Sequence, residues 1–271
     1  MQSPLKLMCI IAHPDDESLA MGGTLAKYAH EGIETSLVVA TRGERGWRGS
    51  DDEHPGEAVL GTVREKELRE ASSVLGISHL AFLDYVDGDL DQTEYTEVVA
   101  KIVTSLRIVR PHVIITFGPD GLYGHPDHIA ISQYTSAAVL CAADPGYPLV
   151  RHIRPHLVSK LYYRVATKKW FADYMPVFGE LVMLIDDVER RATSWDNWAI
   201  TTRVDTSAHW RNVWQAVCCH QTQIPDYRDL QHLTEEDHQK LWGSQEYYRA
   251  FSLVNGGRCE EQDLFEGLRF G

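Results

Sequence analysis

The chain has 271 residues, of which 44% are hydrophobic and 24% are charged, so its composition indicates a folded protein and excludes wholesale disorder. This length favours one large α/β domain over two full ones. The formal net charge of −13 repels polyanions at long range, and we therefore expect no nucleic-acid partner.

The cysteines and the N-terminus predict where the protein resides. The five cysteines have no spacing typical of metal sites or disulfide frameworks, which favours reduced thiols. The first residues lack the basic region and the long apolar run of a signal peptide. No stretch approaches the ~18 consecutive apolar residues of a membrane span. The sequence predicts a soluble cytoplasmic protein with no membrane partner.

Short apolar runs alternate with longer amphipathic stretches through the first half of the chain. The predicted strands are 5–12, 35–40, 79–83 and 113–117, and the predicted helices are 17–31, 57–75, 94–108 and 128–143. Strands that alternate with helices of this length predict a parallel sheet with right-handed crossovers. We therefore expect an α/β fold with a Rossmann-like, mostly parallel sheet and helices on both faces.

The helix predicted for 57–75 has the clearest amphipathic pattern. We expect Val59, Val63 and Leu68 to face the core and Arg64 to lie on the opposite, polar face.

The second half of the chain is less regular. It contains predicted strands at 160–165 and 181–185, a predicted helix at 206–220, and an aromatic segment from Trp170 to Phe178. This segment could line a sugar subsite or pack in the core. Because there is no linker-like stretch, we expect a single domain over 1–271. Residues 1–146 would form its core, and 147–271 an irregular C-terminal part that covers and extends the same sheet.

Polar clusters follow three of the predicted strands. They are His13-Pro14-Asp15-Asp16-Glu17, Thr41-Arg42-Gly43-Glu44 and Tyr123-Gly124-His125-Pro126-Asp127-His128. In an open parallel sheet, ligands bind at the carboxyl ends of the strands. The three clusters are therefore expected to meet at one rim and form a functional site.

Two of these clusters offer metal ligands. His13 and Asp16 are three residues apart at a strand-to-helix turn, and His125 and His128 have the same spacing. Two imidazoles and one carboxylate leave open positions on a divalent ion, which is typical of catalytic zinc and less so of iron(II). Asp15 would remain available to move a proton from water. The alternative is that Asp15 and its acidic neighbours cap the next helix.

These motifs resemble those of a known enzyme family. Residues 12–17 and 125–128 together resemble the paired motifs of the PIG-L (LmbE-like) zinc-dependent N-deacetylases, and are similar to those of the GlcNAc-inositol and GlcNAc-malate deacetylases of mycothiol and bacillithiol biosynthesis. Two weaker features are 41–46 and the run His220-Gln221-Thr222-Gln223, whose histidine is explained more simply as a structural residue at a helix end. The resemblance covers 5–128 and one point near 220.

The resemblance implies a role for each residue of the paired motifs. His13, Asp16 and His128 would bind Zn²⁺, with Fe²⁺ as the other candidate, and Asp15 would be the general base that acts on metal-bound water. His125, as a protonated imidazole, would stabilise the oxyanion or protonate the departing amine.

The resemblance also implies supporting and substrate-binding residues. Asp127 would hold a histidine in its working tautomer, and Tyr123 resembles the family's mobile tyrosine near the acyl oxygen. Arg64 resembles a family arginine expected to bind substrate. Arg42 could hold an anionic group of the substrate, and Glu44 could accept hydrogen bonds from a sugar hydroxyl or cap a turn.

The predicted activity is zinc-dependent hydrolysis of an N-acetyl or other N-acyl group from an amino-sugar derivative. An alternative within the same family is hydration of an unsaturated dicarboxylic acid, with arginines holding its carboxylates. A nucleotide-binding module would belong to a different class, but the glycines of 43–49 match neither GxGxxG nor a phosphate-binding loop. The partner expected is a small N-acylated molecule, and the resemblance also implies a homo-oligomer.

Overall fold

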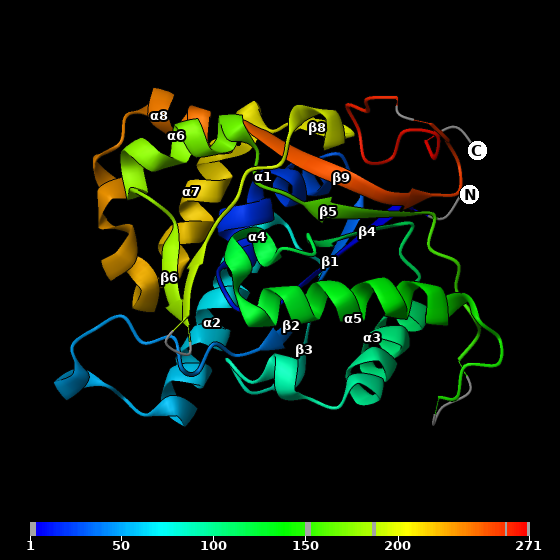
Figure 1. The fold of residues 1–271 in the computed structure, drawn as a ribbon, viewed down its shortest axis with the longest axis horizontal. Helices are drawn as coiled ribbons and strands as arrows, with labels where there is room; N and C mark the ends of the chain where they lie inside the picture. Colours follow the sequence, from blue (N-terminus) through cyan, green and yellow to red (C-terminus); the bar gives the residue numbers. More distant parts are fainter. Residues whose placement is uncertain (1–3, 150–152, 186–187, 258, 270–271) are drawn as a thin grey trace.

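A computed structural model of the chain describes residues 4–149, 153–185, 188–257 and 259–269. Within these residues, a central sheet has seven strands in the order β3-β2-β1-β4-β5-β9-β8 (Figure 1). In that order the strands span His79–Tyr85, Glu34–Thr41, Lys6–Ile11, Val113–Phe117, Lys160–Arg164, Ser244–Ser252 and Thr202–Asp205. Strands β1 to β5 pair in parallel, whereas β9 pairs antiparallel with both of its neighbours. The predicted Rossmann-like, mostly parallel sheet is confirmed.

The helices pack in two groups. The α-helices are α1 (Asp16–His30), α2 (Glu57–Leu75), α3 (Tyr95–Val109), α4 (Gly121–Gly124), α5 (Pro126–Ala143), α6 (Lys168–Phe178), α7 (Trp210–Cys219) and α8 (Glu235–Trp242). Helix α3 packs against α5, while α1, α2 and α7 pack against one another. Strand β2 lies on one side of β1 and β4 lies on the other, so the strand order reverses between β1 and β4. Such a reversal is where open α/β sheets bind ligands.

Most predicted elements lie within a few residues of their expected bounds. The helix predicted for 57–75 and the strand predicted for 113–117 match α2 and β4. The helix expected from 128 begins earlier, at Pro126, because proline suits the first turn of a helix. The strand predicted for 181–185 is β6 (Val182–Ile185), which pairs with β7 (Val188–Arg191) as a hairpin separate from the central sheet.

The buried face of α2 matches the predicted one at Leu68 and differs from it in the first half of the helix. Val59 and Val63 are 53% and 38% exposed, whereas Arg64 is only 3% exposed. The buried stripe runs instead through Leu60, Arg64 and Leu68, with helical spacing. Arg64 can join this stripe because its guanidinium meets backbone carbonyls and a carboxylate beneath the helix. A buried charge with hydrogen-bond acceptors around it is tolerated where a bare one is not, although Arg64 Nε has no hydrogen-bond partner among the described residues.

The C-terminal part of the chain is tied to the sheet through a buried ion pair. Lys160 on β5 lies 2.8 Å from Glu261, and both side chains are fully buried. Glu261 also accepts hydrogen bonds from Tyr162 and Thr202, at 2.6 and 2.9 Å. Across the described ranges, no helix is long and apolar enough to span a membrane.

Candidate metal centre and active site

The loops after β1 and β4 bring two histidines and an aspartate together. His13 Nδ1 lies 3.2 Å from His128 Nε2, and His128 Nε2 lies 3.3 Å from Asp16 Oδ1. All three residues are buried, and their candidate ligand atoms lie within 4.8 Å of one another. Two imidazole nitrogens and one carboxylate oxygen that point at a common centre fit a catalytic divalent metal ion, because this donor set leaves positions open for substrate.

Further contacts orient both imidazoles. His13 Nε2 is 2.9 Å from Asp127 and 3.1 Å from Asp87, while Nδ1 faces the centre of the cluster. Asp127 is itself held by the backbone N–H groups of Gly88 and Leu90, at 2.8 and 3.1 Å. A carboxylate at one ring nitrogen fixes the tautomer that offers the other nitrogen to a metal. The structure thus pairs Asp127 with His13, in the position its predicted role requires.

The electrostatic surroundings favour a positive charge in this cluster. Burial alone would lower the pKa of His13, but the carboxylates of Asp87, Asp127 and Asp16 raise it well above its ordinary value. Burial would raise the pKa of Asp16, but His128 and His13 lower it to about 2. The cluster therefore holds its carboxylates ionised and attracts a cation.

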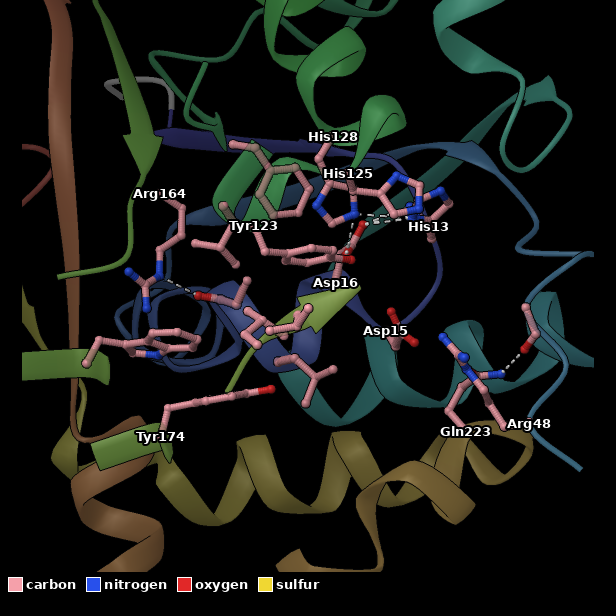
Figure 2. A pocket seen from close by; sticks show the side chains of 18 of the residues that line it. His13, Asp15, Asp16, Arg48, Tyr123, His125, His128, Arg164, Tyr174 and Gln223 are labelled. Atoms are coloured by element: carbon pink, nitrogen blue, oxygen red, sulfur yellow. Dashed lines mark hydrogen bonds and ion pairs between the residues drawn. The ribbon is translucent and has the colours of Figure 1, made fainter. Parts of the chain in front are cut away.

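Asp15 lies beside this cluster in an unusual backbone conformation. Its φ of 102° falls in the left-handed region, and it precedes α1 without making a side-chain capping hydrogen bond to any described residue. The capping explanation of Asp15 is therefore wrong. Its carboxylate lines a cavity and lies 3.2 Å from Arg64 Nη2 (Figure 2). Burial raises the pKa of Asp15, Arg64 opposes that shift, and Asp16 adds to it.

His125 and Tyr123 border the cluster on its other side. The backbone N–H of Asp127 donates to His125 Nδ1 at 3.2 Å, which leaves Nε2 as the donor nitrogen of the neutral ring. Burial and the neighbouring His128 and His13 lower the pKa of His125 to about 3. The hydrogen bond at Nδ1 and the lowered pKa both favour the neutral ring, whereas the sequence predicted a protonated imidazole. Burial raises the pKa of Tyr123 well above its ordinary value, so this phenol stays neutral.

Of Arg64, Arg42 and Glu44, Arg64 is the one that belongs to the described lining of the cavity. Its Nη1 donates to Gly43 O at 2.8 Å and its Nη2 to Pro14 O at 2.6 Å. Arg48 and Gln223 line the same end of the cavity, and Gln223 donates to Gly46 O at 2.8 Å. This end is rich in hydrogen-bond donors and suits a polar substrate group.

Arg42 and Glu44 have other partners. Arg42 pairs with Glu65 at 2.7 Å and Asp84 at 2.6 Å, and its guanidinium packs over an aromatic ring. Glu44 accepts the backbone N–H of Asp87 at 3.1 Å. Neither belongs to the described lining of the cavity. Sequence proximity to the strand end suggested substrate contact, but the neighbouring carboxylates hold Arg42 on the surface.

The cavity has a volume of about 630 Å³ and two chemically different ends. Figure 2 shows Asp15, Arg48 and Gln223 on one side, and Arg164 and Tyr174 on the other, with the metal cluster above and between them. The second end carries Tyr174 of α6, and the ring of Trp170 stacks on it with 4.5 Å between the ring centroids. The described lining of the cavity also includes the apolar residues Leu181, Val182, Leu241 and Trp242. The aromatic segment thus reaches the cavity, while the Phe178 side chain lies outside the described residues.

Sequence reasoning missed Asp87. This buried carboxylate lies in the turn after β3, lines the cavity and contacts His13. Burial would raise its pKa, but His13 and Arg64 lower it well below the usual range. The run Asp84-Tyr85-Val86-Asp87-Gly88 is a fourth polar cluster at a strand end, and that signal could have found it.

His220 lies behind the site. It is fully buried, and its Nε2 lies 2.8 Å from Glu17 Oε1. Burial would lower the pKa of His220, but Glu17 and Asp15 raise it above its ordinary value. The described lining of the cavity includes neither His220 nor Glu17.

The chain is similar in sequence to known proteins of one family. The family described as PIG-L, GlcNAc-PI de-N-acetylase, matches residues 8–139. The 1D-myo-inositol 2-acetamido-2-deoxy-alpha-D-glucopyranoside deacetylase of Geodermatophilus obscurus is 32% identical over 299 residues, which cover 97% of this chain and 98% of that protein. The mycothiol S-conjugate amidase of Streptomyces coelicolor is 29% identical over 297 residues and 99% of each chain.

A solved structure has the same fold over nearly the whole length. The conserved protein TT1542 from Thermus thermophilus has a TM-score of 0.66 and 25% identity, over 93% of this chain and 97% of that one. The N,N'-diacetylchitobiose deacetylase from Pyrococcus horikoshii has a TM-score of 0.67 at 21% identity, over 90% and 83% of the two chains, which shows the fold alone. The matches in sequence show that the chain belongs to the GlcNAc-PI de-N-acetylase (PIG-L) family, a family of N-deacetylase enzymes.

Proposed function

We propose that the protein removes the N-acetyl group from a GlcNAc derivative, with a GlcNAc-inositol as the first candidate substrate. The observation that carries the proposal is the cluster of His13, Asp16 and His128 beside Asp15 at the wall of a cavity. The relative from Geodermatophilus obscurus, which matches almost end to end, is named for deacetylation of a GlcNAc-inositol.

His13, Asp16 and His128 would hold the metal ion, for which we assign Zn²⁺ and keep Fe²⁺ as the other candidate. The chemistry that such an ion supplies is Lewis acidity toward water and the amide carbonyl. Asp15 takes a proton from the attacking water as the new C–O bond forms. Its raised pKa suits this step, because a base that is too weak cannot accept the proton.

The neutral His125 donates from Nε2 to the oxygen that gains negative charge, and Tyr123 offers a phenolic donor beside it. Asp15 then returns its proton to the amide nitrogen as the C–N bond breaks. One water is consumed, and a carboxylate and a primary amine are released. The two ring nitrogens of His125 therefore have separate tasks, one structural and one catalytic.

The polar end of the cavity would bind the sugar side of the substrate. Arg64, Asp87, Arg48 and Gln223 line this end and offer both donors and acceptors for hydroxyl groups. Arg42 and Glu44 lie outside the described lining of the cavity and are not among the proposed substrate contacts.

A second candidate is hydrolysis of an N-acyl group larger than acetyl. The aromatic and aliphatic end of the cavity, with Trp170 and Tyr174, favours a substrate that carries an apolar group there. The Streptomyces coelicolor relative, named as an amidase, agrees with this variant. Both candidates use the same residues at the reacting carbonyl and differ in what fills the apolar end.

The hydratase alternative has less support. The 4-carboxy-2-hydroxymuconate hydratase GalB shares the fold at a TM-score of 0.63, but at 18% identity this likeness carries no information on substrate. We also retain a cytoplasmic location and a homo-oligomer as predictions. Among the described residues all five cysteines are free thiols, which suits a reducing compartment.

The test is amine release from a panel of N-acylated glucosamines, which includes GlcNAc, a GlcNAc-inositol and N-acyl analogues with longer chains. Chelated and zinc-reconstituted protein are compared. Asp15→Ala should retain its metal and lose about 10²- to 10⁴-fold in kcat. Equal release of amine by the chelated protein would contradict the metal-dependent proposal. If zinc-loaded protein releases no amine from any substrate of the panel, the hydratase alternative would be favoured instead.

A further inference from the structure

One peptide group next to the metal cluster is held at both of its polar atoms. Pro14 O accepts a hydrogen bond from Arg64 Nη2 at 2.6 Å. The N–H of the same peptide, on Asp15, donates to Glu17 Oε2 at 3.0 Å. A cation thus holds the oxygen and an anion holds the N–H, so rotation of this peptide would break two charge-assisted hydrogen bonds.

The peptide precedes a strained residue. Asp15 has φ of 102° and ψ of −27°, a conformation that a side chain with a Cβ rarely adopts. Such a conformation persists when surrounding contacts hold it in place. Without them, the backbone would relax toward negative φ and carry the Asp15 carboxylate away from the position it has in Figure 2.

Glu17 is aimed at Asp15 by a second residue. The other carboxylate oxygen of Glu17 contacts His220 Nε2 at 2.8 Å and accepts from Ser18 Oγ at 2.5 Å. Glu17 and His220 are both fully buried, so water does not compete for these bonds. His220 directly follows α7, on the second half of the chain, and reaches the first turn of α1 because α1 packs against α7.

We propose that Glu17 and His220 are positioning residues which, together with Arg64, form a peptide clamp that keeps Asp15 in its strained, productive conformation. The inference rests on the proposed function, in which Asp15 is the general base. Because the described cavity lining contains neither Glu17 nor His220, they act on the reaction through Asp15. The clamp also explains why His220, from the second half of the chain, is buried against the first turn of α1 in the first half.

The test compares two substitutions of Glu17. Glu17→Leu removes the acceptor for the Asp15 N–H at similar size and should lower kcat by about 100-fold, the scale of a misplaced catalytic group, with KM changed by less than about threefold. Glu17→Gln keeps an oxygen acceptor and should recover kcat to within about tenfold of the wild type. Equal losses in both variants would overturn the proposal.

A double-mutant cycle separates positioning from a general structural role. If Glu17 acts through Asp15, Glu17→Leu should change the residual kcat of Asp15→Ala by less than about threefold. A further loss of about 100-fold in that background would overturn the clamp. If Asp15→Ala itself has wild-type kcat, the proposed function fails instead, so the two failures are distinguishable. Should Glu17→Leu not fold, the same cycle is run with His220→Gln.

Stability supplies a readout independent of activity. Glycine adopts positive φ without strain, whereas an alanine freed from the clamp can relax and recover its strain energy, so Glu17→Leu should lower Tm more in the Asp15→Gly background than in the Asp15→Ala background. Equal losses of Tm would contradict strain held by the clamp. Zinc content of each variant is measured in parallel and should stay at the wild-type value.

The matched control is Glu261→Gln, which alters another fully buried carboxylate that pairs with Lys160 and lies outside the described lining of the cavity. This variant should lower Tm while kcat stays within about twofold of the wild type. A loss of kcat as large as that of Glu17→Leu would mean that any buried carboxylate has the same effect, which would overturn the assignment.

Discussion

The two halves of the chain contribute different parts of the site. The metal cluster, Asp15, Asp87 and His125 all follow parallel strands of the first half. The second half extends the sheet with β5, β9 and β8 and supplies Trp170, Tyr174 and the buried His220. Strand ends at a topological switch provide the reacting groups, whereas the covering part shapes the cavity and supports those groups from behind.

This division predicts that changes in the first half affect metal binding and kcat, while changes in the second affect substrate range and stability. The largest effect is expected at His128. His128→Ala removes one of the three proposed ligands, so it should lose the metal and lower kcat by more than the ~10²- to 10⁴-fold cost of losing a general base. Metal analysis after dialysis, with amine release, measures both. His79→Ala, at a histidine whose side chain is 62% exposed, is the control. Unchanged metal content in His128→Ala would contradict the ligand assignment.

A second test of the first half concerns Asp87, which the sequence pattern did not reveal. Its carboxylate holds His13 Nε2, so Asp87→Asn should weaken metal affinity by about 10- to 100-fold. Competition with a chelator measures the affinity. Asp84→Asn, at an exposed carboxylate near the end of β3, should have wild-type affinity. If the two variants bind metal equally well, Asp87 does not orient His13.

The second half should control which acyl groups are accepted. Trp170→Ala removes an aromatic wall from the apolar end, and we expect KM for long-chain N-acyl substrates to rise by about 3- to 10-fold. The kcat for an N-acetyl substrate should change by less than about twofold. Trp198→Ala, at a tryptophan that is 67% exposed, is the matched control. A loss of kcat toward all substrates would instead place Trp170 in the catalytic part of the site.

The smallest effect is on the pH dependence of stability. Because folding raises the pKa of His220, its ion pair with Glu17 contributes fully to the unfolding free energy below the unfolded-state pKa of about 6.5. That contribution is lost as pH rises through the raised folded-state pKa. Denaturant unfolding of metal-free protein at pH 6 and pH 9 should therefore show a difference that His220→Gln reduces by about 1 kcal/mol. An identical pH difference in the variant would contradict this ion pair.

Sequence patterns predicted much of the first half correctly. Hydrophobic periodicity is a local property, and buried strands such as Val113–Phe117 show it clearly. The strand-end clusters also followed from topology, because parallel strands place their carboxyl ends at one edge. The resemblance to the PIG-L family then implied His13, Asp16 and His128 as the ligands, and the structure brings these three side chains together.

Hydrophobic periodicity gave wrong predictions where a polar residue has its own buried partners. Arg64 was expected on the polar face of its helix, yet it is buried because Gly43, Pro14 and Asp15 accept its hydrogen bonds. Arg42 was expected at the substrate and instead pairs with surface carboxylates. Hydropathy assigns a charged residue to solvent, and it cannot register partners that come from other segments.

The sequence by itself determined the type and order of the strands and helices in the first half and the family, and it indicated that His13, Asp16 and His128 would lie together. The tertiary structure decided that Asp87 contacts His13, that a backbone N–H donates to His125 Nδ1, and that His220 contacts Glu17 across 203 positions of the chain. The physical reason is how far apart along the chain the interacting residues lie. Secondary structure follows from neighbours along the chain, whereas burial, charge environment and hydrogen-bond partners depend on which distant segments pack together.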